Sequence, residues 1–348
     1  MSRAQLTSTV EQNTGGAVSP YVAGKNILIN GGMDIWQRGT SSTGIGTAKT
    51  FLADRWYANS ANAATTFGYT QSSSVTTGFQ YAAKIQRTAS NTGTNAIYFQ
   101  QDIETSNSIP FAGQTVTISL YAKAGANFSS ASNALSVNLV SGTGTDQSQY
   151  FAFLTGQATV ASGTATLTTS YQRFAFTGTV SSSATQLGIS INYTPVGTAG
   201  ADDSFFVTGV QVERGSVATP FSRAGGTLSG ELEACQRYYW RVSGATNPYV
   251  GLATCVFNGG TTPSVRRAQV PLPTSMRTSP SVAVSGTTQL YTAGLTNLGS
   301  PSIQANYPAA HFLSIDLIST SAGTLGQSGW WIIDSSSGAN YLEASAEL

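Results

Sequence analysis

The chain has 348 residues, of which only 9% are Asp, Glu, Lys or Arg, with one histidine and a formal net charge of +1. So weak a charge excludes a broad surface for nucleic acid, and we expect no nucleic-acid partner. Closely spaced nucleophiles and proton acceptors are scarce, which argues against a catalyst. No apolar stretch approaches the ~20 residues that span a bilayer, so no membrane insertion is expected.

Residues 1–25 form a polar leader with weak periodicity and no core of their own. Two interpretations stand side by side: a mobile terminus, or an extended peptide that becomes ordered along a partner. The leader lacks the apolar core of a secretion signal, so we expect synthesis in the cytoplasm and another route out of the cell.

Residues 26–223 carry the strand pattern of a β-sandwich, in which apolar and polar side chains alternate. The clearest alternating sets begin at Val116, Leu135 and Leu187, and Gly/Ser/Thr-rich turns separate them. The last strand is expected to place Phe206, Val210 and Val212 on one face with Thr208. Many short antiparallel strands in one block predict a jelly-roll-like sandwich.

Residues 224–241 predict a short connecting helix, which Thr227 can cap. A stripe at spacings of four, three and four consists of Leu228, Leu232, Cys235 and Tyr239. The stripe can pack on the chain's own sheet, or against the same helix of other copies to form a neck.

Residues 242–348 return to the strand pattern and predict a smaller β-sandwich domain, so the fold class is all-β. The aromatic candidates for ligand binding in this domain are Trp330, Trp331, Tyr249, Tyr291 and Tyr307. A strand places Trp330 and Trp331 on opposite faces, so one is expected in the core and the other in the solvent or an interface.

Metal and cofactor signals are weak. Asp202, Asp203 and Glu213 are the candidates for a structural calcium ion, although no fixed loop spacing supports them. Cys235 and Cys255 have no metal or redox spacing; they can form a disulfide with each other, but buried free thiols are the favoured expectation. No cofactor is expected.

Catalytic candidates are present only by default. His311 shares strand parity with the apolar residues that follow it, which predicts a core histidine rather than a base. The sequence has no Gly-x-Ser-x-Gly elbow. The carboxylate pairs that glycoside hydrolysis would need are Asp102 with Glu104 and Asp316 with Asp334. We therefore expect no enzyme activity.

The segment NILINGG at residues 26–32 predicts a strand that ends at its glycines. Trp36 and Trp56 are expected to fill the sandwich core, while neighbouring Asp and Arg residues close its rim. Phe221 is expected to tuck into the sandwich as the last strand leaves it.

Five segments in fixed order carry a family resemblance. They are NILINGGMDIWQRGT at 26–40, LADRWY at 52–57, VTGVQVERGSVATPFSR at 207–223, EACQRYY at 233–239 and VPLPTSMRTSP at 270–280. This set resembles bacteriophage tail-fibre and related virion structural proteins with β-sandwich domains like carbohydrate-binding modules. The resemblance implies a virion component, usually a homotrimer, on the particle surface.

On this resemblance we expect a phage fibre protein. Residues 1–25 would attach it to other virion proteins, and residues 242–348 would form the tip that binds a host-surface receptor, most plausibly a glycan. One alternative is a baseplate or capsid-decoration protein that binds only virion proteins. A second is an envelope polysaccharide depolymerase, which the shortage of clustered acids disfavours.

Overall fold

The structure is a computed structural model that describes residues 23–150, 152–243, 249–257, 264–292, 297–298, 301–319, 326, 328–334 and 340–348. It contains two compact units, one of residues up to Ala234 together with Leu348 and one of Cys235–Glu347. Residues 1–22 of the predicted leader lie outside the described residues. Within the described part, no helix has the length and apolar character needed to cross a membrane.

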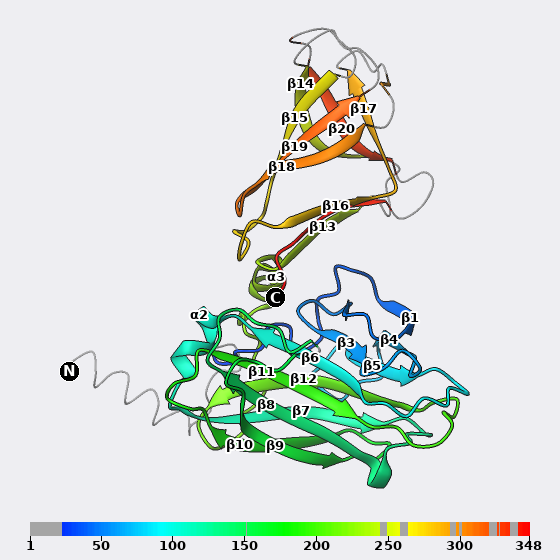
Figure 1. The fold of residues 1–348 in the computed structure, drawn as a ribbon, viewed down its shortest axis with the longest axis vertical. Coiled ribbons are helices and arrows are strands. Elements are labelled where there is room, and N and C mark those ends of the chain that lie inside the picture. Colours follow the sequence, from blue (N-terminus) through cyan, green and yellow to red (C-terminus); the bar gives the residue numbers. More distant parts are fainter. Residues whose placement is uncertain are drawn as a thin grey trace, which may run out of the picture. The chain divides into compact units, whose positions relative to one another are not determined.

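The first unit is a sandwich of two six-stranded antiparallel sheets (Figure 1). One sheet has the order β1 (Ser41–Ile45), β4 (Phe67–Ser72), β5 (Ala82–Arg87), β12 (Ser204–Arg214), β7 (Thr115–Ala124) and β10 (Gln172–Thr179). The other has the order β2 (Thr50–Phe51), β3 (Tyr57–Ser60), β6 (Ile97–Ile103), β11 (Gln186–Tyr193), β8 (Ala134–Gly142) and β9 (Ala158–Thr166). We call these sheet A and sheet B.

Three short helical segments connect strands of this unit, and a fourth, α3 (Leu228–Gln236), follows its last strand. The first three are α2 (Thr105–Ser108) and the 3-10 turns η1 (Ile109–Phe111) and η2 (Ala131–Asn133). The core lies between the sheets, where Ile118 of β7 and Ile189 of β11 belong to one buried cluster. The predicted alternation in β7, β8 and β11 and the predicted sandwich are confirmed.

In β12 the predicted parity is wrong, because a bulge interrupts the strand. The pairing of β12 with β7 shifts between Thr208 and Gln211, where Gly209 adopts a φ of +60°. The extra residue turns Phe205, rather than Phe206, toward the face that holds Val210. A Cβ at position 209 would lie 2.4 Å from the Phe79 ring, so the close packing also requires glycine.

The NILINGG segment forms turns rather than the predicted strand. Its backbone makes two hydrogen bonds to β12, from Ile27 N–H to the Val212 carbonyl at 3.1 Å and from Val210 N–H to the Gly31 carbonyl at 2.9 Å. Several of its other backbone groups bond to side-chain amides. Asn26 Oδ1 accepts from the N–H groups of Leu28 and Val212, and Gln101 exchanges two hydrogen bonds with Ile29. These bonds satisfy the backbone groups that a sheet ladder would otherwise pair.

The tryptophan prediction holds fully for Trp56, which is buried and stacks on Phe99 at 4.8 Å between ring centroids. Trp36 is only half-buried and packs at the edge of the core. The charged neighbours do not all lie at the rim, since Asp54 is fully buried. Phe221 is half-buried and contacts Phe79, with 5.1 Å between ring centroids.

The second unit has its own core between two antiparallel sheets. The small sheet has the order β13 (Tyr239–Ser243), β21 (Tyr341–Ser345) and β16 (Ser281–Ser285). The larger one, which we call sheet D, has the order β17 (Thr287–Thr292), β20 (Ser328–Asp334), β14 (Tyr249–Phe257), β15 (Ser264–Pro271), β19 (Phe312–Ser319) and β18 (Ser302–Pro308).

Candidate functional site

A groove of about 450 Å³ lies on the outer face of sheet B. Side chains that alternate with the core residues along these strands point to this face. The strand register sets them in two rows, Tyr57–Gln100–Ser190–Asn138 and Asn59–Tyr98–Asn192–Ser136. Residues far apart in the sequence therefore form one continuous polar surface.

The groove lining offers hydrogen-bonding groups without charge. It consists of Asn59, Ala61, Tyr98, Gln100, Asn138, Val140, Gln149, Ala152, Phe153, Gln157, Thr159, Ser190 and Asn192. Asn59 is 2% exposed, and its Oδ1 accepts no hydrogen bond from the described residues. A buried acceptor without a hydrogen bond costs about 1–3 kcal/mol, so this oxygen lowers the stability of the sheet locally.

The segment after β8 forms one rim of the groove and brings Gln149, Phe153 and Gln157 to it. Phe153 is 85% exposed, the largest value among the exposed large hydrophobic side chains of the described residues. Gln149 lies against the sheet over Gly188, where an added Cβ would come within 2.0 Å of its Nε2. Glycine at position 188 therefore leaves room for the Gln149 side-chain amide on the strands.

Asp102 of β6 holds that rim in place. Its carboxylate accepts from the backbone N–H of Gln149 at 3.0 Å and from Ser148 Oγ at 2.6 Å. It also accepts from the Tyr57 hydroxyl at 3.0 Å, and Lys49 Nζ lies 3.6 Å away. Burial, followed by the charge of Asp102, raises the pKa of Tyr57, so the phenol stays protonated and continues to donate.

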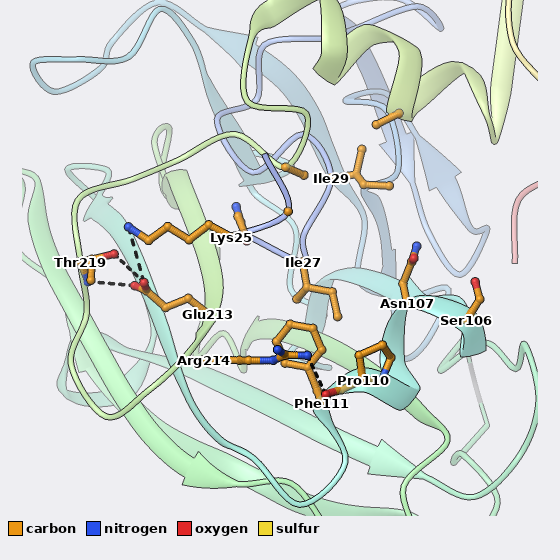
Figure 2. A pocket seen from close by; sticks show the side chains of 14 residues that line it. Lys25, Ile27, Ile29, Ser106, Asn107, Pro110, Phe111, Glu213, Arg214 and Thr219 are labelled. Carbon is orange, nitrogen blue, oxygen red and sulfur yellow. Dashed lines mark hydrogen bonds and ion pairs between the residues drawn. The ribbon is translucent and has the colours of Figure 1, made fainter. Parts of the chain in front are cut away.

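A second pocket, of about 640 Å³, lies elsewhere in the first unit (Figure 2). Its floor includes Ile27 and Phe111, and Arg214 Nη2 donates to the carbonyl of Pro110 at 2.7 Å. Glu213 accepts from the backbone N–H of Thr219 at 2.8 Å. Its charged groups are thus engaged by neighbouring residues of the same pocket.

The predicted calcium residues do not converge. Asp202 pairs with Lys84 at 2.9 Å, and Asp203 pairs with Arg87 at the same distance. Glu213 instead accepts hydrogen bonds from Gln211 and Thr219 and lies 3.8 Å from Lys25 Nζ. Among the described residues, no three His, Cys, Asp or Glu side chains gather as metal ligands would. The calcium hypothesis is therefore wrong for this set.

The two adjacent tryptophans of the second unit lie on opposite faces of β20, as the alternation of a strand predicts. Trp331 is fully buried in the core, and Trp330 is 43% exposed on the opposite face. Trp331 is thus not a surface contact for a ligand. Tyr291 is half-buried opposite Trp330, whereas the side chains of Tyr249 and Tyr307 lie outside the described residues.

The predicted helical stripe is broken. Helix α3 ends at Gln236, so Tyr239 belongs to β13 and not to the helix. Cys235 and Tyr239 are buried, while Leu228 and Leu232 are exposed. The helix ends early because the N–H of Tyr238 turns to the Cys235 carbonyl at 2.9 Å. A neck built from all four residues is therefore wrong.

Two residues considered as catalytic candidates make hydrogen bonds within the second unit. His311 is exposed, outside β19, and lies 2.6 Å from Ser275 Oγ through its Nδ1, so the prediction of a core histidine is wrong. Asp316 accepts from the Arg267 guanidinium at 2.8 Å. Cys235 and Cys255 are buried free thiols, as predicted.

Sequence reasoning missed the groove on sheet B. The available signal was the run of amides, hydroxyls and aromatics at outward positions, as in Tyr98–Gln100, Ser136–Asn138 and Ser190–Asn192. Alternation alone identifies an outward face. It does not say which strands lie side by side.

Neither a protein-family model nor a curated protein matches the sequence. Several solved structures are similar to part of the chain. One titled "CBM4 structure and function" has 19% identity and a TM-score of 0.32, and the match covers 53% of this chain and 98% of the chain in that structure. A family 61 carbohydrate-binding module solved with β-1,4-galactotriose has 12% identity and a TM-score of 0.32, covering 55% and 99%. A xylan-binding family 22 module of Paenibacillus barcinonensis has 12% identity and a TM-score of 0.30, covering 56% and 98%.

Proposed function

We propose that this chain is a non-catalytic glycan-binding protein, and that a carbohydrate chain lies in the groove on sheet B. The observation that carries this proposal is the uncharged lining. Amides of Gln100 and Asn138 stand in one row with the Ser190 hydroxyl, and Tyr98 and Phe153 supply aromatic surface. Sugars present hydroxyl groups and apolar C–H faces, which match such a lining.

The groove is also prepared for a ligand that makes hydrogen bonds. Within the described residues, no hydrogen bond occupies the side-chain amides of Gln100 and Asn138. The rim is held by Asp102, so little conformational freedom is lost when a ligand enters.

The groove is tested by affinity electrophoresis through gels that contain soluble xylan, galactan, mixed-linkage β-glucan or bacterial lipopolysaccharide. We expect at least one polymer to retard the protein. Asn138→Ala and Gln100→Ala should each weaken binding about three- to tenfold, the value of one net hydrogen bond. Gln172→Ala, an exposed amide on β10 of sheet A, is the matched control and should bind as the wild type does.

Failure of every polymer to retard the wild-type protein would refute glycan binding. Unchanged affinity of the Asn138 and Gln100 variants would exclude the groove. Release of oligosaccharides from any of these polymers would show that the protein is an enzyme and overturn its non-catalytic role.

We further propose that the chain acts as a fibre protein of a bacteriophage virion and attaches the particle to a host-surface glycan. The support is the ordered set of motifs from residue 26 to residue 280, together with the glycan chemistry of the groove. Immunogold electron microscopy of particles from a phage that carries this gene should label the tail or fibres. Unlabelled particles would refute the virion role, and a monomer in light scattering would refute the expected trimer.

A further inference from the structure

The exposed Trp330 and the half-buried Tyr291 form an aromatic pair on the outer face of sheet D in the second unit. Trp330 of β20 stands directly opposite Tyr291 of β17 and Thr254 of β14 in the strand register. Its neighbour Trp331 fills the core, which anchors the strand that presents Trp330. Side chains directly opposite on antiparallel strands have Cβ atoms about 4.5–5.5 Å apart, so the indole and the phenol share one surface.

Trp330 borders a shallow hollow of about 400 Å³. The hollow is lined by Gly251, Leu252, Ala253, Thr254, Trp330 and Ile332, none of which is charged. A Cβ added at Gly251 would meet no atom within 4 Å. Neither its φ nor its neighbours require glycine at this position, and the space above it stays open.

Hydrogen-bonding groups lie on β17, opposite the hollow-lining residues Trp330 and Ile332 in the strand register. The Tyr291 hydroxyl donates to Gln289 Oε1 at 2.7 Å, and Asn297 Nδ2 donates to the same oxygen at 2.8 Å. Gln289 lies opposite Ile332 in the register. The network therefore fixes a phenol and two amides beside the apolar hollow, and Thr254 adds a hydroxyl on the other side.

We propose that this set, which we call the Trp330 surface, is a second carbohydrate-binding site that is independent of the groove. An uncharged sugar ring stacks on the indole of Trp330, and its hydroxyls bond to Thr254 and to the Tyr291–Gln289 network. An aromatic wall with a few placed polar groups is the usual composition of a small-ligand site.

The size of the surface favours a sugar over a second protein chain. A stable protein interface takes roughly 20–30 residues from each side. The hollow is lined by six residues, which suits one or two sugar rings. A second copy of this chain is the rival occupant, and the test below separates the two.

The test uses the full chain in two backgrounds, wild type and a groove variant that combines Asn138→Ala with Gln100→Ala. Trp330→Ala removes the stacking ring, and Gly251→Leu places a side chain in the hollow, where an added Cβ meets no atom within 4 Å. Val256→Ala is the matched control, because Val256 is an exposed residue of β14 outside the hollow. Binding is measured with the same four polymers, and mass is measured by light scattering.

We expect the groove variant to keep a residual affinity for one of the polymers. Trp330→Ala and Gly251→Leu should each reduce that residual affinity about tenfold or more, whereas Val256→Ala leaves it unchanged. Tryptophan emission should shift when the polymer is added to the groove variant and should not shift after Trp330→Ala.

Two outcomes overturn this proposal, and a third refutes the groove while leaving this proposal intact. If the groove variant binds no polymer and Trp330→Ala binds as tightly as wild type, only the groove is a glycan site. If Trp330→Ala lowers the mass in solution without changing polymer binding, the surface joins copies of the chain. If instead the groove substitutions change nothing and Trp330→Ala abolishes binding, the Trp330 surface stands and the groove proposal fails.

Discussion

Arg87 and Asp203 form an ion pair in the interior of the first unit, where neither side chain is exposed. Arg87 also donates to the carbonyls of Gly93 and Gly197, both at 3.0 Å. Asp203 accepts from the backbone N–H and the hydroxyl of Ser129 at 2.9 and 2.8 Å. Because backbone and hydroxyl groups also bond to both ions, the pair fixes where these loops meet.

Removing one partner of this pair should therefore be costly. Arg87→Met leaves the Asp203 charge buried without its cation and should lower the free energy of unfolding by about 3–5 kcal/mol. The double variant Arg87→Met with Asp203→Leu should recover part of the loss, since no uncompensated charge remains. Urea unfolding of the single and double variants measures this, and a double variant less stable than Arg87→Met would contradict it.

At the scale of elements, backbone irregularities determine where strands turn their side chains. The bulge in β12 inserts an extra residue between Phe205 and Val210, so both side chains face the core although an odd number of positions separates them. Gly209 makes the bulge possible because it adopts a positive φ. The N–H of Val210 just after the bulge donates to the Gly31 carbonyl at 2.9 Å. The bulge thus gives the NILINGG turns a place to bind, although neither segment forms regular ladder pairs with the other.

Substitution at the bulge tests this account. Gly209→Ala places a methyl group on a left-handed residue and against the Phe79 ring, and should cost about 1–3 kcal/mol of stability. Gly68→Ala on β4 is the matched control, because an added Cβ there makes only ordinary contacts, the nearest at 3.5 Å. Equal effects in thermal unfolding would contradict the bulge requirement.

The start of helix α3 depends on a buried carboxylate. Glu231 accepts from the backbone N–H groups of Asn30 and Gly225, the latter at 2.7 Å. Burial raises its pKa above the usual value of about 4.5, although these two hydrogen bonds oppose the shift. The folded state therefore favours the protonated form, and the contribution of Glu231 to stability falls as the pH rises through the folded pKa.

Glu231→Gln should abolish that pH dependence and leave one backbone N–H without an acceptor, at a cost of about 1–3 kcal/mol. Because only the wild type gains a proton on folding, the stability difference should widen as the pH falls from about 7 to about 4.5. Urea unfolding across this range measures it. The exposed Glu233→Gln on the same helix should show no such trend, and a constant difference for Glu231→Gln would contradict the assignment.

At the scale of the whole molecule, each unit has a separate core. Leu120 belongs to the buried cluster of the first unit and Trp331 to that of the second. Each core draws its residues from its own sheets, so either unit has the means to fold on its own.

Calorimetry of the full chain should therefore show two unfolding transitions. Trp331→Ala should lower the free energy of unfolding of the second unit alone, by about 3–5 kcal/mol. Leu120→Ala should lower that of the first unit alone, by about 2–5 kcal/mol. A single transition that moves with either substitution would show that the units unfold together.

The sequence predicts regular strands well and the groove poorly, for one physical reason. Alternation in β7, β8 and β11 is local, so the pattern of each strand identifies its buried face. The groove depends on sheet order, which places residues as distant as Asn59 and Asn192 in one row. No local pattern in the sequence reveals that order. The bulge at Gly209 and the amide-bonded NILINGG turns could not be predicted for the same reason, since both depend on contacts between distant parts of the chain.

The groove on sheet B is built without formal charge, since none of its described lining residues is Asp, Glu, Lys, Arg or His. Coulombic attraction weakens as dissolved ions shorten the Debye length from about 30 Å in dilute solution to about 3 Å at molar salt, whereas neutral hydrogen bonds and stacking do not depend on it. Binding of an uncharged ligand in this groove would therefore change little between a dilute buffer and a concentrated salt solution.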